Sequence, residues 1–422
     1  MQVRDNTMTL WKHKDFLKLW AGQTISLAGS QVTTLALPLV AVITLNATPF
    51  QMGLFQVANS IPVLLLGLFV GVWVDRMRRR PILITADLGR ALLLGSIPLA
   101  ALFHFLHIEY LYLVIFLVGI LNLFFDVAHT SLLPSLVTRE RIVEGNSKLE
   151  VSRSGAMMFG PALAGILVQL VTAPLAMIVD ALSFVGSACF LIRIRQQEEV
   201  SRVRDQKTGI LADIGEGLRA IWSNQLLRTL ASSLATYNFF ASMVNTMYLL
   251  YATRFLKVPP SLLGVIFGLG SVGFMLGALL ANPAKKRFGI GPTIVWAACI
   301  SDVGFLLIAL TANQPLLIAV PLLIGAQFIS TLTGPITAIN QLSLRQSITP
   351  DRLQGRVNGT MRFTAQCLSP IGGLVAGTIG SAIGLWPAIF IGTLGIQFGF
   401  VILLFSPVRT FREQPQAAAT GD

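Results

Sequence analysis

The chain has 422 residues, of which 54% are apolar and only 12% are charged. Soluble globular proteins carry about a quarter charged residues, so the composition excludes an ordinary cytosolic enzyme, a disordered protein and a disulfide scaffold. The net charge of +12 would suit a nucleic-acid partner, but the basic residues lie in short clusters between apolar runs. We therefore predict an integral membrane protein in a lipid bilayer, with no nucleic-acid partner.

Charges and turn residues cut the chain into twelve apolar runs. Each is long enough to cross a bilayer as a helix, which takes about 20 residues. Helices satisfy every backbone hydrogen bond in lipid, and the alternating pattern of barrel strands is absent. We predict an all-α integral membrane fold with twelve transmembrane helices in two pseudo-symmetric six-helix bundles. The predicted spans cover residues 19–44, 51–74, 82–105, 110–136, 149–171, 174–193, 228–254, 260–283, 291–312, 315–340, 357–381 and 385–406.

Lysine and arginine are distributed unevenly between the two ends of these spans. With the N-terminus inside, the outside loops hold only Arg254 and Lys257 among the basic residues. Segments rich in Lys and Arg stay on the cytoplasmic side of a membrane. We therefore expect both termini in the cytoplasm and a multi-pass protein of a bacterial-type inner membrane. Because no cleavage pattern precedes the first span, we expect that span to be retained rather than removed as a signal peptide.

An internal repeat divides the chain into two halves. Residues 52–55 (Met-Gly-Leu-Phe) return 211 residues later as 263–266 (Leu-Gly-Val-Ile), and residues 138–142 match residues 349–353 at the same offset. Six spans followed by six more from the same side indicate a parallel duplication. Between the halves, Ile214, Leu218 and Ile221 share one face of an amphipathic helix. The predicted domains are an N-terminal bundle at 1–193, a cytoplasmic linker with an amphipathic helix at 194–227, a C-terminal bundle at 228–406 and a cytoplasmic tail at 407–422.

The loop after the second span combines a glycine, an acid and a run of arginines in the order G-x-x-x-D-R-x-x-R-R, from Gly71 to Arg80. This order resembles the loop signature of the major facilitator superfamily, in which it acts as a cytoplasmic latch. The resemblance implies that Gly71, Asp75, Arg76, Arg79 and Arg80 form the latch. The counterpart at residues 282–289 keeps the cations and lacks the acid. Asp87 and Arg90 lie three residues apart on one helix face, and we expect a structural pair that supports the latch.

Span five contains Gly155, Gly160, Pro161 and Gly165. Small residues allow close helix packing and proline bends a helix. The segment resembles the Gly-Pro signature of the exporters of the family, which implies efflux. Residues 20–23, 86–90, 131–137 and 349–359 resemble the drug:proton antiporter branch that contains macrolide efflux proteins and the enterobactin exporter.

Charges within a membrane cost about 2.5–3.5 kcal/mol on insertion scales, which makes them candidates for function. Asp126 and His129 lie three residues apart in span four, and an imidazole beside a carboxylate can share its proton. Asp180 and Asp302 lie deeper within their spans. We predict that these four residues couple transport to protons, with purely structural roles as the alternative.

Polar stripes predict where a solute is bound. The resembled fold implies that spans one, four, seven and ten line the central cavity, and hydrogen bonding between packed helices is the alternative. The candidate lining residues are Gln23, Ser26, Ser30, Thr34, Asn122, Asn238, Ser242, Asn245, Gln327 and Thr331.

These observations predict a secondary active exporter. It moves a bulky amphiphilic solute, such as a macrolide or a siderophore, by alternating access and as a proton antiporter. The chain has no Gly-Lys dipeptide, which excludes a P-loop. An uptake carrier of the same fold remains open. A membrane enzyme for lipid or prenyl substrates remains a remote alternative, because we find no clustered carboxylates that would hold a metal. We expect a monomer with small-molecule and proton partners, no catalytic residues, no cofactor and no metal.

Overall fold

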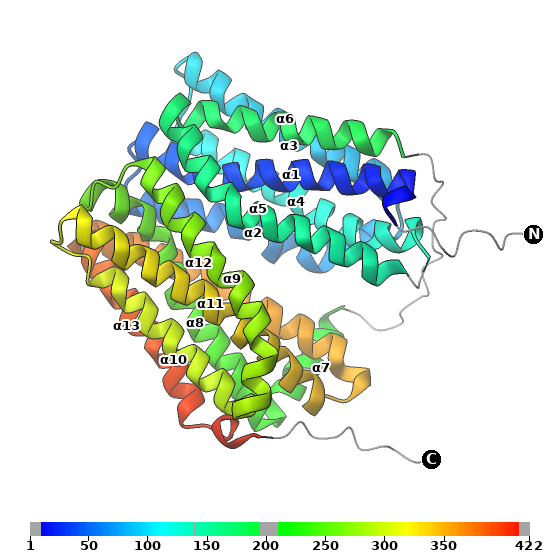
Figure 1. The fold of residues 1–422 in the computed structure, drawn as a ribbon, viewed down its shortest axis with the longest axis vertical. Helices are drawn as coiled ribbons and strands as arrows, with labels where there is room; N and C mark the ends of the chain where they lie inside the picture. Colours follow the sequence, from blue (N-terminus) through cyan, green and yellow to red (C-terminus); the bar gives the residue numbers. More distant parts are fainter. Residues whose placement is uncertain (1–9, 139–140, 195–209, 413–422) are drawn as a thin grey trace, which may run out of the picture. The chain divides into compact units, whose positions relative to one another are not determined.

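The computed structural model describes residues 10–138, 141–194 and 210–412, and this part of the chain is built from helices (Figure 1). Eleven of the described helices are long and apolar enough to cross a membrane. They are α1 (Lys14–Leu39, extended by a π-helical turn at Val40–Thr44), α2 (Pro49–Asp75), α3 (Arg79–Leu102), α4 (Ile108–Leu136), α5 (Ile142–Val171), α6 (Ala173–Ile192), α9 (Pro260–Phe288), α10 (Ile290–Ala309), α11 (Leu316–Ile348), α12 (Asp351–Ile383) and α13 (Leu385–Leu404).

Helix α8 (Gln225–Leu250) corresponds to the seventh predicted span, and its most apolar stretch has a lower mean hydropathy than those of the other eleven helices. Its 26 residues extend about 39 Å at 1.5 Å per residue, more than the thickness of about 30 Å that a spanning helix must cover. Its lower hydropathy has a local cause, because the predicted stripe of Asn238, Ser242 and Asn245 belongs to this helix. The prediction of a twelve-helix all-α membrane fold is confirmed.

Local sequence explains where several helices begin and end. Asn224 caps α8, because its side-chain oxygen accepts hydrogen bonds from the backbone N–H groups of Leu226 and Leu227 at 2.9 and 3.3 Å. Gly289 and Gly384 separate α9 from α10 and α12 from α13 with φ values of 89° and 105°. Side chains other than hydrogen rarely allow this conformation. The two glycines therefore mark tight reversals between consecutive helices of the second half.

The chain folds into two compact units. The first contains the described residues within 1–46 and 61–205. In it α1 packs against α5 and α6, and α3 packs against α4 and α6. Its buried core includes Phe16, Leu83, Leu132 and Leu191. Burial of these apolar side chains stabilises the packing of the helices in this unit.

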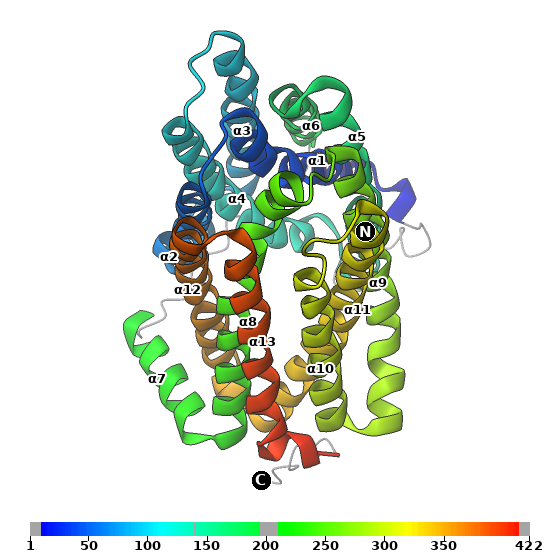
Figure 2. The same ribbon diagram turned by 90° about the vertical axis from the view of Figure 1, so that its left-hand side faces the viewer.

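The second unit contains the described residues within 47–60 and 206–422. Figure 2 shows α8 beside α12 and α13, and α10 beside α11. The first turns of α2 belong to this unit because they lie on α12, where a Cβ at Gly53 would stand 2.9 Å from the carbonyl oxygen of Gly373. Gln56, farther along α2, donates a hydrogen bond to the hydroxyl of Ser369 at 3.3 Å.

Helix α7 (Ile210–Ser223) corresponds to the predicted amphipathic helix and packs on α12. Ile221 is buried, Leu218 is exposed, and Glu216 forms an ion pair with Arg356. The side chains of Ile210 to Ile214 and all of residues 195–209 lie outside the described residues. The division of the chain at residues 194–227 stays a prediction.

Candidate functional site

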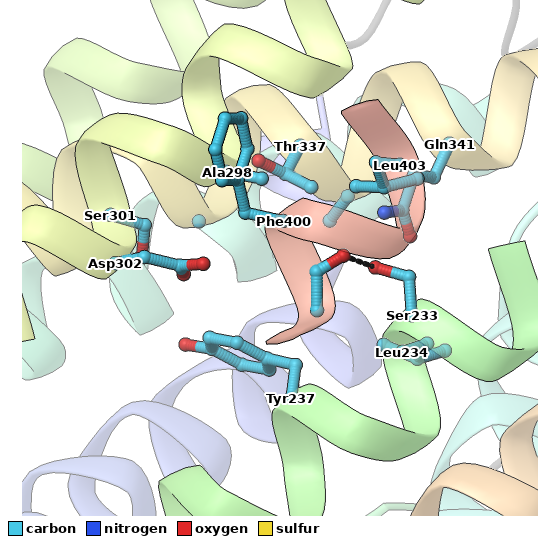
Figure 3. A pocket seen from close by; sticks show the side chains of 13 residues that line it. Ser233, Leu234, Tyr237, Ala298, Ser301, Asp302, Thr337, Gln341, Phe400 and Leu403 are labelled. Carbon is cyan, nitrogen blue, oxygen red and sulfur yellow. Dashed lines mark hydrogen bonds between the residues drawn. The ribbon is translucent and has the colours of Figure 1, made fainter. Parts of the chain in front are cut away.

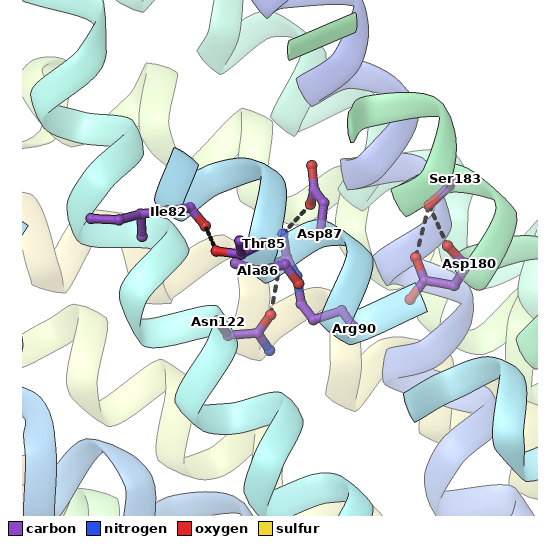
Figure 4. A network of polar contacts seen from close by, with 8 residues as sticks. All are labelled: Ile82, Thr85, Ala86, Asp87, Arg90, Asn122, Asp180 and Ser183. Atoms are coloured by element: carbon purple, nitrogen blue, oxygen red, sulfur yellow. Dashed lines mark hydrogen bonds and ion pairs between the residues drawn. The ribbon is translucent and has the colours of Figure 1, made fainter. Parts of the chain in front are cut away.

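A buried ion pair lies on α3 within the first unit (Figure 4). Arg90 and Asp87, one turn apart on α3, pair with side chains that are 5% and 0% exposed. Nη1 of Arg90 also donates a hydrogen bond to Oδ1 of Asn122 on α4 at 2.8 Å. Removing two charges from water is costly unless both are hydrogen-bonded, and here each charge has partners. The sequence predicted this pair but not its partner on α4.

Two aromatic rings enclose the Arg90 guanidinium. Its central carbon lies 4.2 Å from the ring centroid of Phe125 on α4 and 4.1 Å from that of Phe184 on α6. A cation between two ring faces is attracted by both ring quadrupoles. Through ionic, hydrogen-bonding and cation–π contacts, this one side chain joins α3 to α4 and α6.

Asp180 lies beside this network on α6 and is fully buried. The hydroxyl of Thr33 on α1 donates a hydrogen bond to its carboxylate, and the hydroxyl of Ser183 donates another at 2.9 Å. The sequence assigned Asp87 and Asp180 to separate roles, in the latch and in proton coupling, whereas the structure places both in or beside one polar network.

His129 continues the stack on α4. Its ring lies on that of Phe125, with centroids 5.8 Å apart and an interplanar angle of 12°. Within the described residues, Nε2 of His129 is buried and has no hydrogen-bond partner. Asp126, three residues earlier, is exposed. Whether the two share a proton stays a prediction.

The predicted latch residues occupy the end of α2 and the start of α3. Arg80 reaches the last turn of α6, where its Nε donates to the carbonyl oxygen of Leu191 at 2.9 Å and its Nη2 to that of Ile192. A cation at this position suits the negative end of a helix. Arg76 is exposed, Arg79 is half-buried, and the side chain of Asp75 lies outside what the structure describes. A Cβ at Gly71 would meet no described atom within 4 Å.

The glycines of the span-five motif differ in what they touch. A Cβ at Gly160 would overlap Gln31 of α1, with Cγ at 2.6 Å, whereas a Cβ at Gly155 would meet nothing within 4 Å. Gly165 is buried, and Pro161 lies within α5, which continues unbroken to Val171. Of Gly155 and Gly160, only Gly160 therefore makes a close helix approach. The link of the motif to efflux stays a prediction.

The predicted stripe residues fall into two groups. Several are committed to hydrogen bonds inside a unit: Ser242 donates to the carbonyl oxygen of Ser369 at 2.5 Å, and Thr331 to that of Gly270 at 2.5 Å. Others are more open, since Asn245, Thr34 and Asn122 are exposed and Gln23 is half-buried. Of these, Thr34 donates a hydrogen bond to Ser30, and Asn122 accepts one from Arg90. The remaining ones are Ser26 (buried), Ser30, Asn238 (donating to Leu234) and Gln327 (against Gly270).

A cavity of about 160 Å³ lies inside the second unit, among α8, α10, α11 and α13 (Figure 3). Asp302 of α10 lines it and is only 2% exposed. The hydroxyl of Tyr237 on α8 turns toward the Asp302 carboxylate. Sequence reasoning identified Asp302 but missed Thr337 and Gln341 of α11, which line the same cavity. Both sit on one helix face at a four-residue spacing, which is the signal that would have identified them.

Comparison with known proteins places this architecture. A family model described as Major Facilitator Superfamily matches residues 19–369. The multidrug efflux pump Tap of Mycolicibacterium fortuitum is 27% identical over 388 residues, which is 90% of this chain and 92% of that protein. Macrolide efflux protein A of Streptococcus pyogenes is 23% identical over 412 residues, covering 94% and 97% of the two chains.

Two solved structures share the fold. A bacterial homologue of the iron transporter ferroportin, in its inward-facing state, superposes with a TM-score of 0.74 at 17% identity and covers 94% of this chain and 99% of its own. The nucleoside transporter NupG does so with a TM-score of 0.73 at 14% identity, covering 93% and 98%. At these identities the likeness shows the fold alone.

Proposed function

Because the chain belongs to the Major Facilitator Superfamily, we propose that it exports a bulky amphiphilic solute from the cytoplasm by alternating access, in exchange for protons. That it is a multi-pass membrane transporter of small molecules, and not an enzyme, follows from the family and its relatives. The observation that carries the export proposal is the end-to-end similarity to two proteins whose names are those of efflux pumps.

The distribution of charge supports the orientation that export requires. Only Arg254 and Lys257 lie in the loops assigned to the outside, and basic loops stay in the cytoplasm. We propose an inner-membrane location with both termini in the cytoplasm, and a monomer. Two of the more open stripe residues, Gln23 and Asn245, are the proposed contacts of the solute, because their amide groups can bond a polar substituent.

Buried carboxylates support proton exchange. Asp180 is enclosed by hydroxyl donors next to Arg90, and no described residue forms an ion pair with Asp302. An intramembrane acid without a fixed counter-ion is a suitable proton carrier. We propose that Asp302, Asp180 and the Asp126–His129 pair bind and release the coupling protons.

Transport into everted membrane vesicles tests the proposal. The panel contains macrolides, cationic dyes and siderophores, each measured with an imposed pH gradient and after a protonophore has collapsed it. We expect at least one solute to accumulate only while the gradient exists. Accumulation that survives its collapse would refute proton exchange. Uptake by right-side-out vesicles in place of everted ones would show a carrier that imports.

Substitution of single carboxylates tests the coupling residues. We expect Asp302→Asn, Asp180→Asn or Asp126→Asn to flatten the pH dependence of solute accumulation, because each removes one protonatable group. Asp351→Asn is the matched control, since Asp351 is exposed at the start of α12 and accepts a hydrogen bond from Gln354 at 3.0 Å. If the three test variants keep the wild-type pH profile as the control does, the coupling assignment is wrong even where export itself is confirmed.

A further inference from the structure

The Asp302 cavity holds a buried acid that lacks a counter-ion. Among the residues that the structure describes, none donates a hydrogen bond to Oδ2 of Asp302. The nearest elements contribute neutral groups: Tyr237 from α8, Thr337 and Gln341 from α11, and Phe400 from α13. An ionised carboxylate in such surroundings is strongly destabilised, so it either takes up a proton or is joined by a cation. The cavity therefore combines open space with an unmatched site for positive charge.

The first unit shows what fills the corresponding place. The repeat offset of 211 residues relates Ala298 to Asp87, Ser301 to Arg90 and Thr337 to Asp126. It also relates Tyr237 to Ser26. All four second-unit residues line the cavity. In the first unit this position is occupied by the Arg90 guanidinium, which pairs with Asp87 and lies between two aromatic rings. In the second unit a serine stands at the position of the arginine, and the acid Asp302 stands where the first unit has Ala91.

We propose that this cavity binds a compact organic cation, a protonated amine or a guanidinium, with Asp302 as its counter-ion. The rings of Tyr237 and Phe400 offer apolar and cation-attracting surfaces, and the oxygens of Ser301, Thr337 and Gln341 accept N–H hydrogen bonds. An apolar cavity of about 150 Å³ accommodates benzene. The volume of about 160 Å³ here thus suits one ring-sized group.

A hydrated metal cation fits this lining less well. Hard cations prefer several oxygen ligands, usually with more than one carboxylate among them, whereas Asp302 is the one carboxylate in the lining and the other side-chain oxygens are those of neutral Ser, Thr, Tyr and Gln residues. The further assignment of this cavity as the pocket that binds the amine group of the exported solute rests on the proposed function. The binding of the cation itself requires no transport and is measured separately.

Direct binding to the purified protein in detergent tests the site. The probe is benzylammonium, and benzyl alcohol is its neutral isostere of nearly the same size. We expect saturable binding of benzylammonium to the wild type by calorimetry, and at least tenfold weaker binding to Asp302→Asn. Benzyl alcohol should bind weakly and equally to both. Asp302→Asn is expected to fold, because it removes an unpaired buried charge. Asp351→Asn, which changes an exposed acid, should bind like the wild type.

A second variant tests the place of binding. Ala298→Leu adds bulk to the cavity wall without changing charge and should weaken both probes. Equal benzylammonium affinity in the wild type and Asp302→Asn would overturn the proposal, as would displacement of the probe by sodium chloride but not by tetramethylammonium chloride at equal ionic strength. If export is driven by protons but Asp302→Asn binds benzylammonium as the wild type does, the cation site is refuted and the export proposal stands. If binding depends on Asp302 but no solute is exported, the export proposal is refuted and the cation site stands.

Discussion

Gly160 of α5 and Gln31 of α1 lie so close that a single methyl group on the glycine would overlap the glutamine side chain. The neighbouring motif glycine, Gly155, has no described atom within 4 Å of the place where its Cβ would stand. Two glycines in one sequence motif therefore meet different constraints. Helices without side chains between them approach closely and gain dispersion contacts, and in this motif that approach is made at Gly160.

Substitution of Gly160 should consequently destabilise the first unit. Gly160→Ala forces Gln31 or the backbone to move, and overpacking of this kind costs about 1–3 kcal/mol. Gly155→Ala should leave stability unchanged or raise it slightly, because alanine favours a helix over glycine. Thermal unfolding of both variants in the same detergent measures the difference. Equal melting temperatures for the two variants would contradict a packing role for Gly160.

Substitution in the Arg90 network should destabilise the protein far more than substitution in a partly exposed ion pair of the same spacing. Removing one partner of a buried ion pair costs about 3–5 kcal/mol, so Asp87→Ala should lower the melting temperature markedly. Lys18 and Asp15 also lie three residues apart, but this pair is only partly buried, with side chains 25% and 16% exposed. Asp15→Ala is the comparison variant, since ion pairs that stay in contact with water contribute about 0–1 kcal/mol. Similar losses in the two variants would show that burial of the Arg90 pair adds nothing.

Features that depend on a single segment could be predicted from the sequence, whereas contacts between helices could not. The spans follow from hydropathy, which is a property of each segment alone, and the ion pair of Asp87 and Arg90 follows from helix periodicity. The contacts of Arg90 with Asn122 and Phe184 do not follow from either, because they depend on which helices pack together. Asp302 was found as a charge in an apolar run, while its cavity arises from four helices. Periodicity predicts which residues share one face of a helix, but the residues that this face contacts depend on how the helices pack.

Two glycines of α7, Gly215 and Gly217, also differ in how closely they approach α12. A Cβ at Gly217 would stand 2.8 Å from the backbone carbonyl oxygen of Arg356, whereas one at Gly215 would meet nothing within 4 Å. A backbone atom cannot move aside as a side chain can, so Gly217→Leu should displace α7 and break the ion pair of Glu216 with Arg356. Limited proteolysis should then cut the variant near α7 several-fold faster than the wild type. Gly215→Leu should be cut at the wild-type rate, and faster cutting there instead would locate the docking contact elsewhere.

The two groups of stripe residues on α8 should respond to substitution in opposite ways. The hydroxyl of Ser242 donates a hydrogen bond to the carbonyl oxygen of Ser369. Loss of such an interhelical hydrogen bond costs about 0.6–1.7 kcal/mol in membrane proteins. Ser242→Ala should therefore lower the melting temperature slightly while the relative rates for different solutes stay the same. Asn245 is exposed, so Asn245→Ala should leave stability unchanged and alter the solute preference in everted vesicles. Melting curves and a vesicle panel on the same preparations measure both effects. A change of preference in Ser242→Ala with none in Asn245→Ala would mean that the solute contacts lie on the packed side of the helix.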